Sequence, residues 1–103
     1  MTTPTIPAGA TADTWATDNG HQCRVVRLAP RTIPGQDVLI ISSAIQFENG
    51  SYDDGSTDEP PLMFIESGGG NGLTTAQARA FAAAILASAD ELDQLTGEAP
   101  PFM

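Results

Sequence analysis

His21 and Cys23 form a His-x-Cys pair, and side chains of these two types can ligate a metal or support nucleophilic catalysis. A structural zinc site takes four nitrogen or sulfur ligands, and the chain holds no other histidine or cysteine. Asp13 or Asp18 could add an oxygen ligand, or a dimer could bring a second pair. The sequence offers no group to orient the pair and no oxyanion donor. An exposed histidine beside a strand cysteine is therefore expected, and no catalytic or metal-ligating residue is assigned.

Four carboxylates gather in the loop over residues 49–61, at Asp53, Asp54, Asp58 and Glu59. A calcium loop of the EF-hand type needs oxygen ligands at alternate positions, a central glycine and a closing glutamate. The aspartates here do not follow that spacing. Because charge runs are usually solvated, the sequence predicts a solvated acidic loop, and whether it binds anything stays open.

A glycine-rich segment, SGGGNG over residues 67–72, precedes a helical pattern, where phosphate-binding loops also occur. It matches neither G-x-G-x-x-G nor G-x-x-x-x-G-K-[ST], and it lacks the lysine of the second motif. No second carboxylate is placed opposite Glu66 for acid–base chemistry. The sequence therefore predicts a non-enzymatic protein without a cofactor.

The clearest element is a helix expected over Leu73–Gly97. Thr74 and Gln77 have the spacing of a capping box, and Gly97 followed by two nearby prolines supplies the stop. Apolar residues recur at i, i+3, i+4 and i+7, which predicts one buried stripe. Its members are Ala78, Phe81, Ala82, Ile85, Ala89, Leu92 and Leu95 or Thr96.

A second set of small residues lies on other faces of this helix, at Ala80, Ala83, Ala84 and Ala87. They either fill a half-exposed surface or let another helix approach closely, as in a dimer. About 22 residues extend about 33 Å, whereas a strand of five or six residues spans about 17–20 Å. The overhang favours a homodimer that covers these alanines.

Three segments before the helix are typical of strands, namely His21–Ala29, Asp37–Glu48 and Leu62–Ser67. Trp15 marks a further short strand or an aromatic docked against the sheet. Consecutive strands followed by one helix predict an α+β fold. We expect a three- to four-stranded antiparallel sheet with one long C-terminal helix packed on it.

The segment Asp37–Glu48 has one parity predicted to face the core, formed by Leu39, Ile41, Ser43, Ile45 and Phe47. Its first half is apolar on both faces, as in a central strand or one covered by a dimer. Val38 and Ile40 therefore join the four alanines as a possible interaction surface. Ser42 and Ser43 suggest a bulge.

The 103 residues predict one domain over 13–97, with a flexible tail over 1–12 and another over 98–103. A net charge of −9 with no lysine opposes direct binding of nucleic acid or of an anionic membrane. The sequence has no apolar run long enough for a membrane span and no signal-peptide pattern, and one cysteine fits a reducing compartment. A cytoplasmic location is expected.

The pattern L-T-x-A-Q-A-R-x-F-A-A-A-I-L-x-S-A-D-E-L-D, from Leu73 to Asp93, resembles the closing helix of small uncharacterised proteins of actinobacteria and their phages. Some of those proteins carry a Cys-x-x-Trp-Cys…His cluster that looks like a metal site. Here Thr14 and Ala16 flank Trp15, and the cysteines beside it are absent. The resemblance implies an origin and no mechanism.

The sequence thus predicts a small acidic protein-interaction module, phage-encoded and dimeric, that binds a host or phage protein. One alternative is an acidic mimic of nucleic acid, with its carboxylates gathered on one face. These would be Asp53, Asp54, Asp58, Glu59, Asp90, Glu91 and Asp93. Another is a metal or small-molecule binder built on His21, Cys23 and nearby aspartates.

Overall fold

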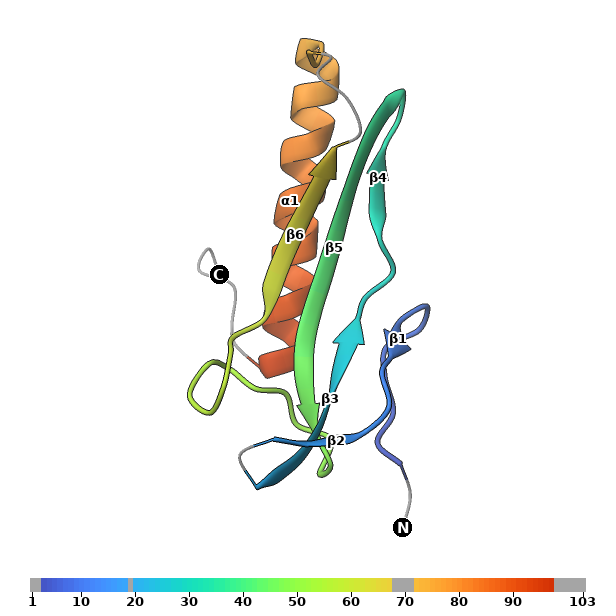
Figure 1. Cartoon of the computed structure of the whole chain (residues 1–103). Coiled ribbons are helices and arrows are strands. Elements are labelled where there is room, and N and C mark those ends of the chain that lie inside the picture. Colours follow the sequence, from blue (N-terminus) through green and yellow to red (C-terminus); the bar gives the residue numbers. More distant parts are fainter. Residues whose placement is uncertain (1–2, 19, 68–71, 98–103) are drawn as a thin grey trace.

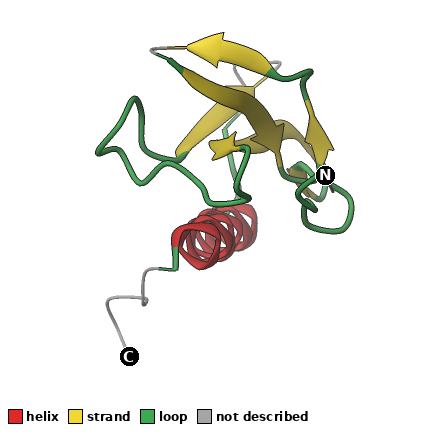
Figure 2. Ribbon diagram, turned by 90° about the horizontal axis from the view of Figure 1, so that it is seen from below, coloured by secondary structure: helices red, strands yellow, loops and turns green. Residues whose placement is uncertain are grey.

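A computed structural model describes residues 3–18, 20–67 and 72–97 of the chain. It consists of a curled antiparallel sheet and one helix that covers one face of it, so the α+β class is confirmed (Figures 1 and 2). The elements in chain order are β1 (Thr11–Ala12), β2 (Ala16–Asp18), β3 (His21–Arg27), β4 (Arg31–Ile33), β5 (Gln36–Phe47), β6 (Leu62–Ser67) and α1 (Thr75–Thr96).

The sheet is built around β5, which pairs with β3 and β4 along one side and with β6 along the other. β1 and β2 pair in turn with β3. The sheet has six strands rather than three or four. The additional strands are two or three residues long, too short to show an alternating pattern.

The helix covers the face of β5 opposite to the predicted core face, although Ser43 and Ile45 of the predicted face are also buried. Ile40 on the other face lies opposite Arg31 of β4, and Arg31 donates hydrogen bonds to Ser88 and Glu91 of α1. Directly opposed residues share a face of an antiparallel sheet, so the helix covers the parity of Ile40. Its other members Ser42, Ala44 and Gln46 are also buried. Sequence could not separate two faces that are both apolar.

The predicted bulge at Ser42 and Ser43 is also absent. The register of β5 with β6 runs without a break from Val38 to Ser43, and its register with β3 continues from there to Phe47. The irregularity lies instead in β4, between Thr32 and Ile33. Ser42 and Ser43 therefore belong to a regular strand ladder, and both side chains are buried.

The helix begins as expected, with Thr74 as N-cap and a complete capping box with Gln77, and it ends at Gly97 in the left-handed conformation. The predicted stripe is rotated, however. Ala78 and Ala82 are exposed, whereas Ser88 is 2% exposed and shares the buried face with Leu92. Ser88 is polar and was therefore left out of the apolar pattern, and its hydroxyl accepts a hydrogen bond from Arg31 Nε.

The helix is not longer than the strand on which it packs. β5 is a strand of 12 residues, which spans about 40 Å and exceeds the roughly 33 Å of α1. Figure 1 shows β5 running beside most of the helix, with the first turn of α1 extending past the start of β5. The length argument for a dimer that shelters the end of the helix therefore fails.

The segment expected as a flexible tail over residues 1–12 takes part in the fold in its described portion. Thr11 and Ala12 form β1, and the backbone carbonyls of Pro4 and Thr5 accept hydrogen bonds from Arg24 and Gln46. The composition of residues 1–12, with its prolines and threonines, suggested a tail. The contacts that hold Pro4 and Thr5 use backbone carbonyls, which every residue type carries, so the sequence gives no sign of them. The predicted tail over 98–103 lies outside the described residues.

Candidate protein-interaction surface

β6 is an edge strand of the described sheet, because it pairs with β5 alone. Its outer side therefore presents backbone N–H and C=O groups that no other described strand pairs. Such an edge is a template for another strand, and natural proteins often shield it with charges, proline or a covering element. Within β6 only Glu66 carries a charge, and the strand has no proline.

The same strand carries most of the large exposed apolar side chains among the described residues. Leu62 is 37% exposed, Phe64 50% and Ile65 51%, and the two others are Leu73 and Leu86 of the helical region. Scattered apolar residues are normal on a protein surface, but here three of them belong to one edge strand. We call the edge of β6 with Leu62, Met63, Phe64 and Ile65 the β6 surface.

Two of these side chains lie on the face of the sheet that the helix leaves uncovered. Leu62 lies opposite Ser43 of β5, and Phe64 lies opposite Ile41. Residues of this parity alternate with those facing the helix, so Leu62, Phe64 and Glu66 project to the open face. Phe64 and half-buried Ile41 together give this face an apolar centre.

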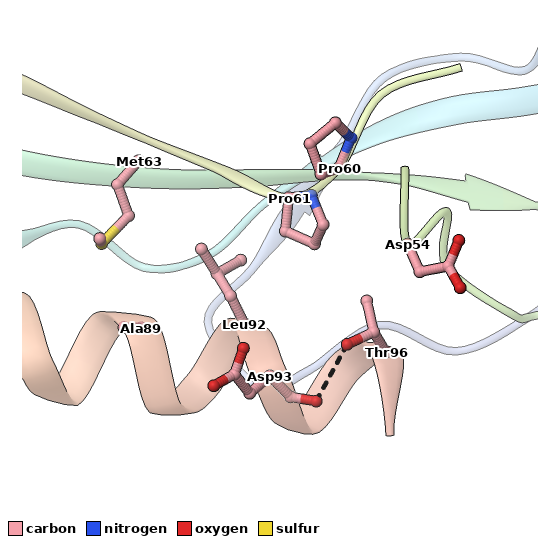
Figure 3. Close-up of a pocket in the computed structure, with 8 residues that line it drawn as sticks. All are labelled: Asp54, Pro60, Pro61, Met63, Ala89, Leu92, Asp93 and Thr96. Carbon is pink, nitrogen blue, oxygen red and sulfur yellow. Dashed lines mark hydrogen bonds between the residues drawn. The ribbon is translucent and has the colours of Figure 1, made fainter. Parts of the chain in front are cut away.

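Met63 and Ile65 project to the other side, where each lines a cavity between β6 and α1. Met63 and Pro61 face Ala89 and Leu92 across a cavity of about 280 Å³ (Figure 3). Ile65 shares a second cavity, of about 460 Å³, with residues that include Val38, Leu73 and Phe81. The helix packs mainly on β5 and β4, and the two cavities lie between it and β6.

The six residues of the predicted interaction surface are not brought together as one exposed patch. Ala80 and Ala83 are exposed, and Ala84, Ala87 and Val38 are half-buried. Ile40 is 1% exposed, so its side chain is enclosed within the chain and cannot meet a partner. Ile40 is therefore removed from the interaction surface, because the helix covers its parity of β5.

The His21 and Cys23 pair lies at the far end of the sheet from the helix N-terminus. The His21 ring lies 6.0 Å from that of Phe47, centroid to centroid. Burial, and then the charges of Asp18, Asp58 and Asp53, raise the pKa of the Cys23 thiol. A raised pKa disfavours the thiolate, which is the form that attacks or ligates. No group of three metal-ligating side chains comes together within the described parts of the chain.

The acidic loop is not uniformly solvated, because Asp53 is 1% exposed. Its Oδ1 accepts the backbone N–H groups of Gly55 and Thr57, and its Oδ2 accepts those of Asp58 and Glu59, at 2.8–3.3 Å. Residues 55–59 of the loop therefore surround the Asp53 carboxylate and donate hydrogen bonds to it. Asp54 and Asp58 remain exposed, as expected.

The carboxylates named for a nucleic-acid mimic do not act as one face. Asp53 is buried among backbone donors, and Glu91 pairs with Arg31. Asp54 and Asp93 both line the first cavity, whereas Asp58 lies beside Asp18 at another site. Two of the seven carboxylates are thus engaged inside the chain, and the others are divided between surfaces.

Sequence reasoning treated Leu62–Ser67 as a strand and missed it as a candidate site. The available signal was an apolar run, Leu62–Ile65, that occupies both faces, as in Val38–Ile41. The first of these runs lies at an edge and the second in the centre of the sheet. Periodicity cannot distinguish these positions, because the distinction depends on pairing between distant segments.

Among the described residues no helix is both long and apolar enough to cross a lipid bilayer. No protein-family model, curated protein or solved structure matches the chain. The β6 surface and its flanking cavities therefore carry the functional argument.

Proposed function

We propose that the protein is a small acidic, non-enzymatic interaction module that binds an extended segment of another protein along β6. The observation that carries this proposal is the coincidence of an unpaired strand edge with three exposed apolar side chains. The resemblance of the C-terminal helix adds the expectation that the chain is phage-encoded and acts in the host cytoplasm. Its partner is then a host or phage protein.

The mode of binding is strand addition. In this mode backbone hydrogen bonds supply affinity, and pockets for alternate side chains supply specificity. The β6 surface has both parts, because the edge offers the backbone groups and the two cavities lie where side chains of an added strand could enter. Phe64 on the open face would contact the residues of alternate parity.

The chemistry of the partner follows from the lining of the cavities. Four apolar residues line one part of the second cavity and favour an aliphatic or aromatic side chain there, whereas Gln36, Asp37 and Ser67 line another part. Asp54 and Asp93 line the first cavity beside Met63, which favours a basic residue with an apolar stem. The net charge of −9 favours a basic partner over an acidic one.

Selection of peptides from a random library against the folded protein tests the proposal. Selected peptides should have apolar side chains at alternate positions and should protect the backbone amides of β6 from hydrogen exchange. Phe64→Lys should weaken their binding about 30-fold, as expected of a central hot-spot residue. Peptides that bind this variant as well as the parent chain would refute the β6 site.

A matched control uses the same introduced side chain on the helix. Ala83 is exposed and lies nine residues before buried Leu92, which places it on the opposite side of α1. Ala83→Lys should leave peptide binding unchanged. Loss of binding in this variant and not in Phe64→Lys would move the site to the alanine face of the helix.

A further inference from the structure

A further cavity, of about 330 Å³, lies on the face of the sheet that the helix leaves uncovered, and none of its lining residues belongs to β6. We infer that this cavity binds a small organic cation, a guanidinium or ammonium group carried on a short aliphatic chain. The site is separate from the β6 surface and goes beyond the proposed function. We call it the open-face cavity, bounded by Asp18, Cys23, Val25, Ile45, Asp58 and Glu59.

Strand register places the floor of the open-face cavity. Val25 of β3 lies directly opposite Ile45 of β5, and Ala16 of β2 lies opposite Cys23 of β3. Because Cys23 and Val25 are two residues apart, these four side chains share one face of the sheet. Ile45 has the parity opposite to that of Ile40, which the helix covers, so the shared face is the open one. The floor is therefore largely apolar.

The acidic loop forms one border of this floor and carries two carboxylates. Its buried Asp53 donates a backbone N–H group to the Ile45 carbonyl, which holds the loop beside β5. The N–H groups of Asp58 and Glu59 donate to the Asp53 carboxylate at 2.8 and 3.0 Å. Both residues line the cavity, so the loop fixes their position at its rim. The rim is therefore preorganised for a ligand.

Asp18 of β2 lies at the same rim, and the fold brings it against Asp58. Asp18 lies opposite His21, which has the parity of Cys23, so the Asp18 side chain projects to the open face. A side-chain hydrogen bond joins the two aspartates and, together with the charge of Asp18, raises the pKa of Asp58. Two carboxylates in contact repel each other unless a proton or another cation lies between them.

The arginines within the described ranges leave this pair of aspartates without a cation. The ion pairs there are Arg27–Asp13 and Arg31–Glu91. Arg24 borders the cavity, but its guanidinium donates to the Gln46 side chain and to the Pro4 carbonyl. Arg79 belongs to α1, which covers the other face of the sheet. A ligand guanidinium would complement the pair, because its planar N–H groups can bond two carboxylate oxygens side by side.

The floor favours an organic cation over a metal ion. A metal ion needs several ligating atoms around it, and no three metal-ligating side chains converge in the described part of the chain. Val25 and Ile45 offer no oxygen to such an ion but can pack against an aliphatic chain. A volume of about 330 Å³ is also in the range of small-molecule sites. Charge complementarity and the apolar floor thus select the same kind of ligand.

Titration of the isotope-labelled full chain with n-butylguanidinium, followed by NMR, tests the site. Saturable shifts should centre on the amides of Cys23, Val25 and Ile45, with a dissociation constant of about 1 mM. The neutral isostere n-butylurea, and guanidinium without the chain, should each bind at least about 10-fold more weakly. Absence of saturable shifts in the parent chain, or equal binding of n-butylurea, overturns the inference.

Asp58→Asn separates ligand binding from folding. This variant loses the repulsion with Asp18 and should remain folded, yet it should weaken n-butylguanidinium binding about 10-fold. Asp54→Asn is the matched control, because Asp54 belongs to the same loop but lines the first cavity and not this one. It should leave the binding unchanged. Equal weakening by both variants would indicate attraction to the acidic surface as a whole and would overturn the inference.

Discussion

At the scale of single residues, the most informative group is the Asp53 carboxylate. Burial alone would raise the pKa of this carboxyl, but the four backbone N–H groups it accepts outweigh burial and lower its pKa. The charged form is therefore the one that the fold requires. The N–H groups of Gly55, Asp58 and Glu59 donate to the Asp53 carboxylate instead of to another strand. These hydrogen bonds fix the shape of the loop between β5 and β6.

This arrangement predicts a loss of stability in acid. Because the pKa of Asp53 is lower in the folded state, its contribution is complete above the unfolded value of about 3.9 and is lost as pH falls through the folded value. Asp53→Ala should reduce the free energy of unfolding by about 2–3 kcal/mol at neutral pH. Urea unfolding from pH 7 to pH 3 should show the difference between parent and variant shrinking. A difference constant with pH would contradict this role.

Asp58 should behave in the opposite sense. A hydrogen bond with the Asp18 side chain and the charge of that residue raise the pKa of Asp58. Its contribution therefore favours folding at low pH and is lost as pH rises through the folded pKa. Asp58→Asn removes this repulsion and should raise the melting temperature at pH 7 and have no such effect at pH 3. Asp54→Asn, whose pKa is lowered in the fold, should not raise it.

At the scale of elements, β4 is a strand of three residues that depends on the helix. Arg31 donates from Nε to the Ser88 hydroxyl at 3.1 Å and forms an ion pair with Glu91. At the other end of α1, Gln77 Oε1 accepts from the Gln36 side chain at the start of β5. Side-chain bonds thus tie the helix to β4 and to the start of β5.

Replacing Arg31 tests this attachment. Arg31→Leu removes the partner of buried Ser88 and should lower the free energy of unfolding by about 1–2 kcal/mol. Arg27→Leu is the matched control, because Arg27 pairs with Asp13 in an ion pair whose two side chains are about half exposed. Its effect should be clearly smaller, because solvent screens an exposed ion pair. Equal effects in urea unfolding would show that the contact with Ser88 adds nothing.

Elements with a clear local sequence signal were predicted, whereas features that depend on the folded structure were not. The capping box and β6 depend on neighbouring residues, and both were predicted. β1 and β4 were missed because strands of two or three residues show no periodic pattern, and β2 was expected only as one of two alternatives for the chain around Trp15. Ser88 and Asp53 were misjudged for one reason, because a buried polar group looks like a surface group until its hydrogen-bond partners are known. The edge position of β6 required the complete strand order.

At the scale of the whole molecule, the N-terminal segment is held by a buried polar network. Arg24 donates to the Gln46 side chain and to the Pro4 carbonyl, and it stacks on Trp15 at 4.5 Å. Gln46 is completely buried and donates to the Thr5 carbonyl. Trp15 is therefore an anchor, half-buried beneath a guanidinium.

Truncation should reveal this network as a coupling energy. Deleting residues 1–5 removes two backbone acceptors and should lower the free energy of unfolding by about 1–3 kcal/mol. Arg24→Ala should have a smaller effect in the truncated chain than in the full chain, because the contact with Pro4 is already lost. A double-mutant cycle in urea measures the difference. Additive effects would show that the segment is independent of the sheet.

The length of β5 has a consequence for how the molecule opens. Its first half pairs with β4 and β6, and its second half pairs with β3, which in turn carries β1 and β2. Neither half of the sheet can separate without breaking a ladder on the same continuous strand. The amides in the middle of β5 should therefore exchange with deuterium only when the entire chain unfolds. Although the two halves of β5 pair with different strands, the protein should therefore unfold in one cooperative step.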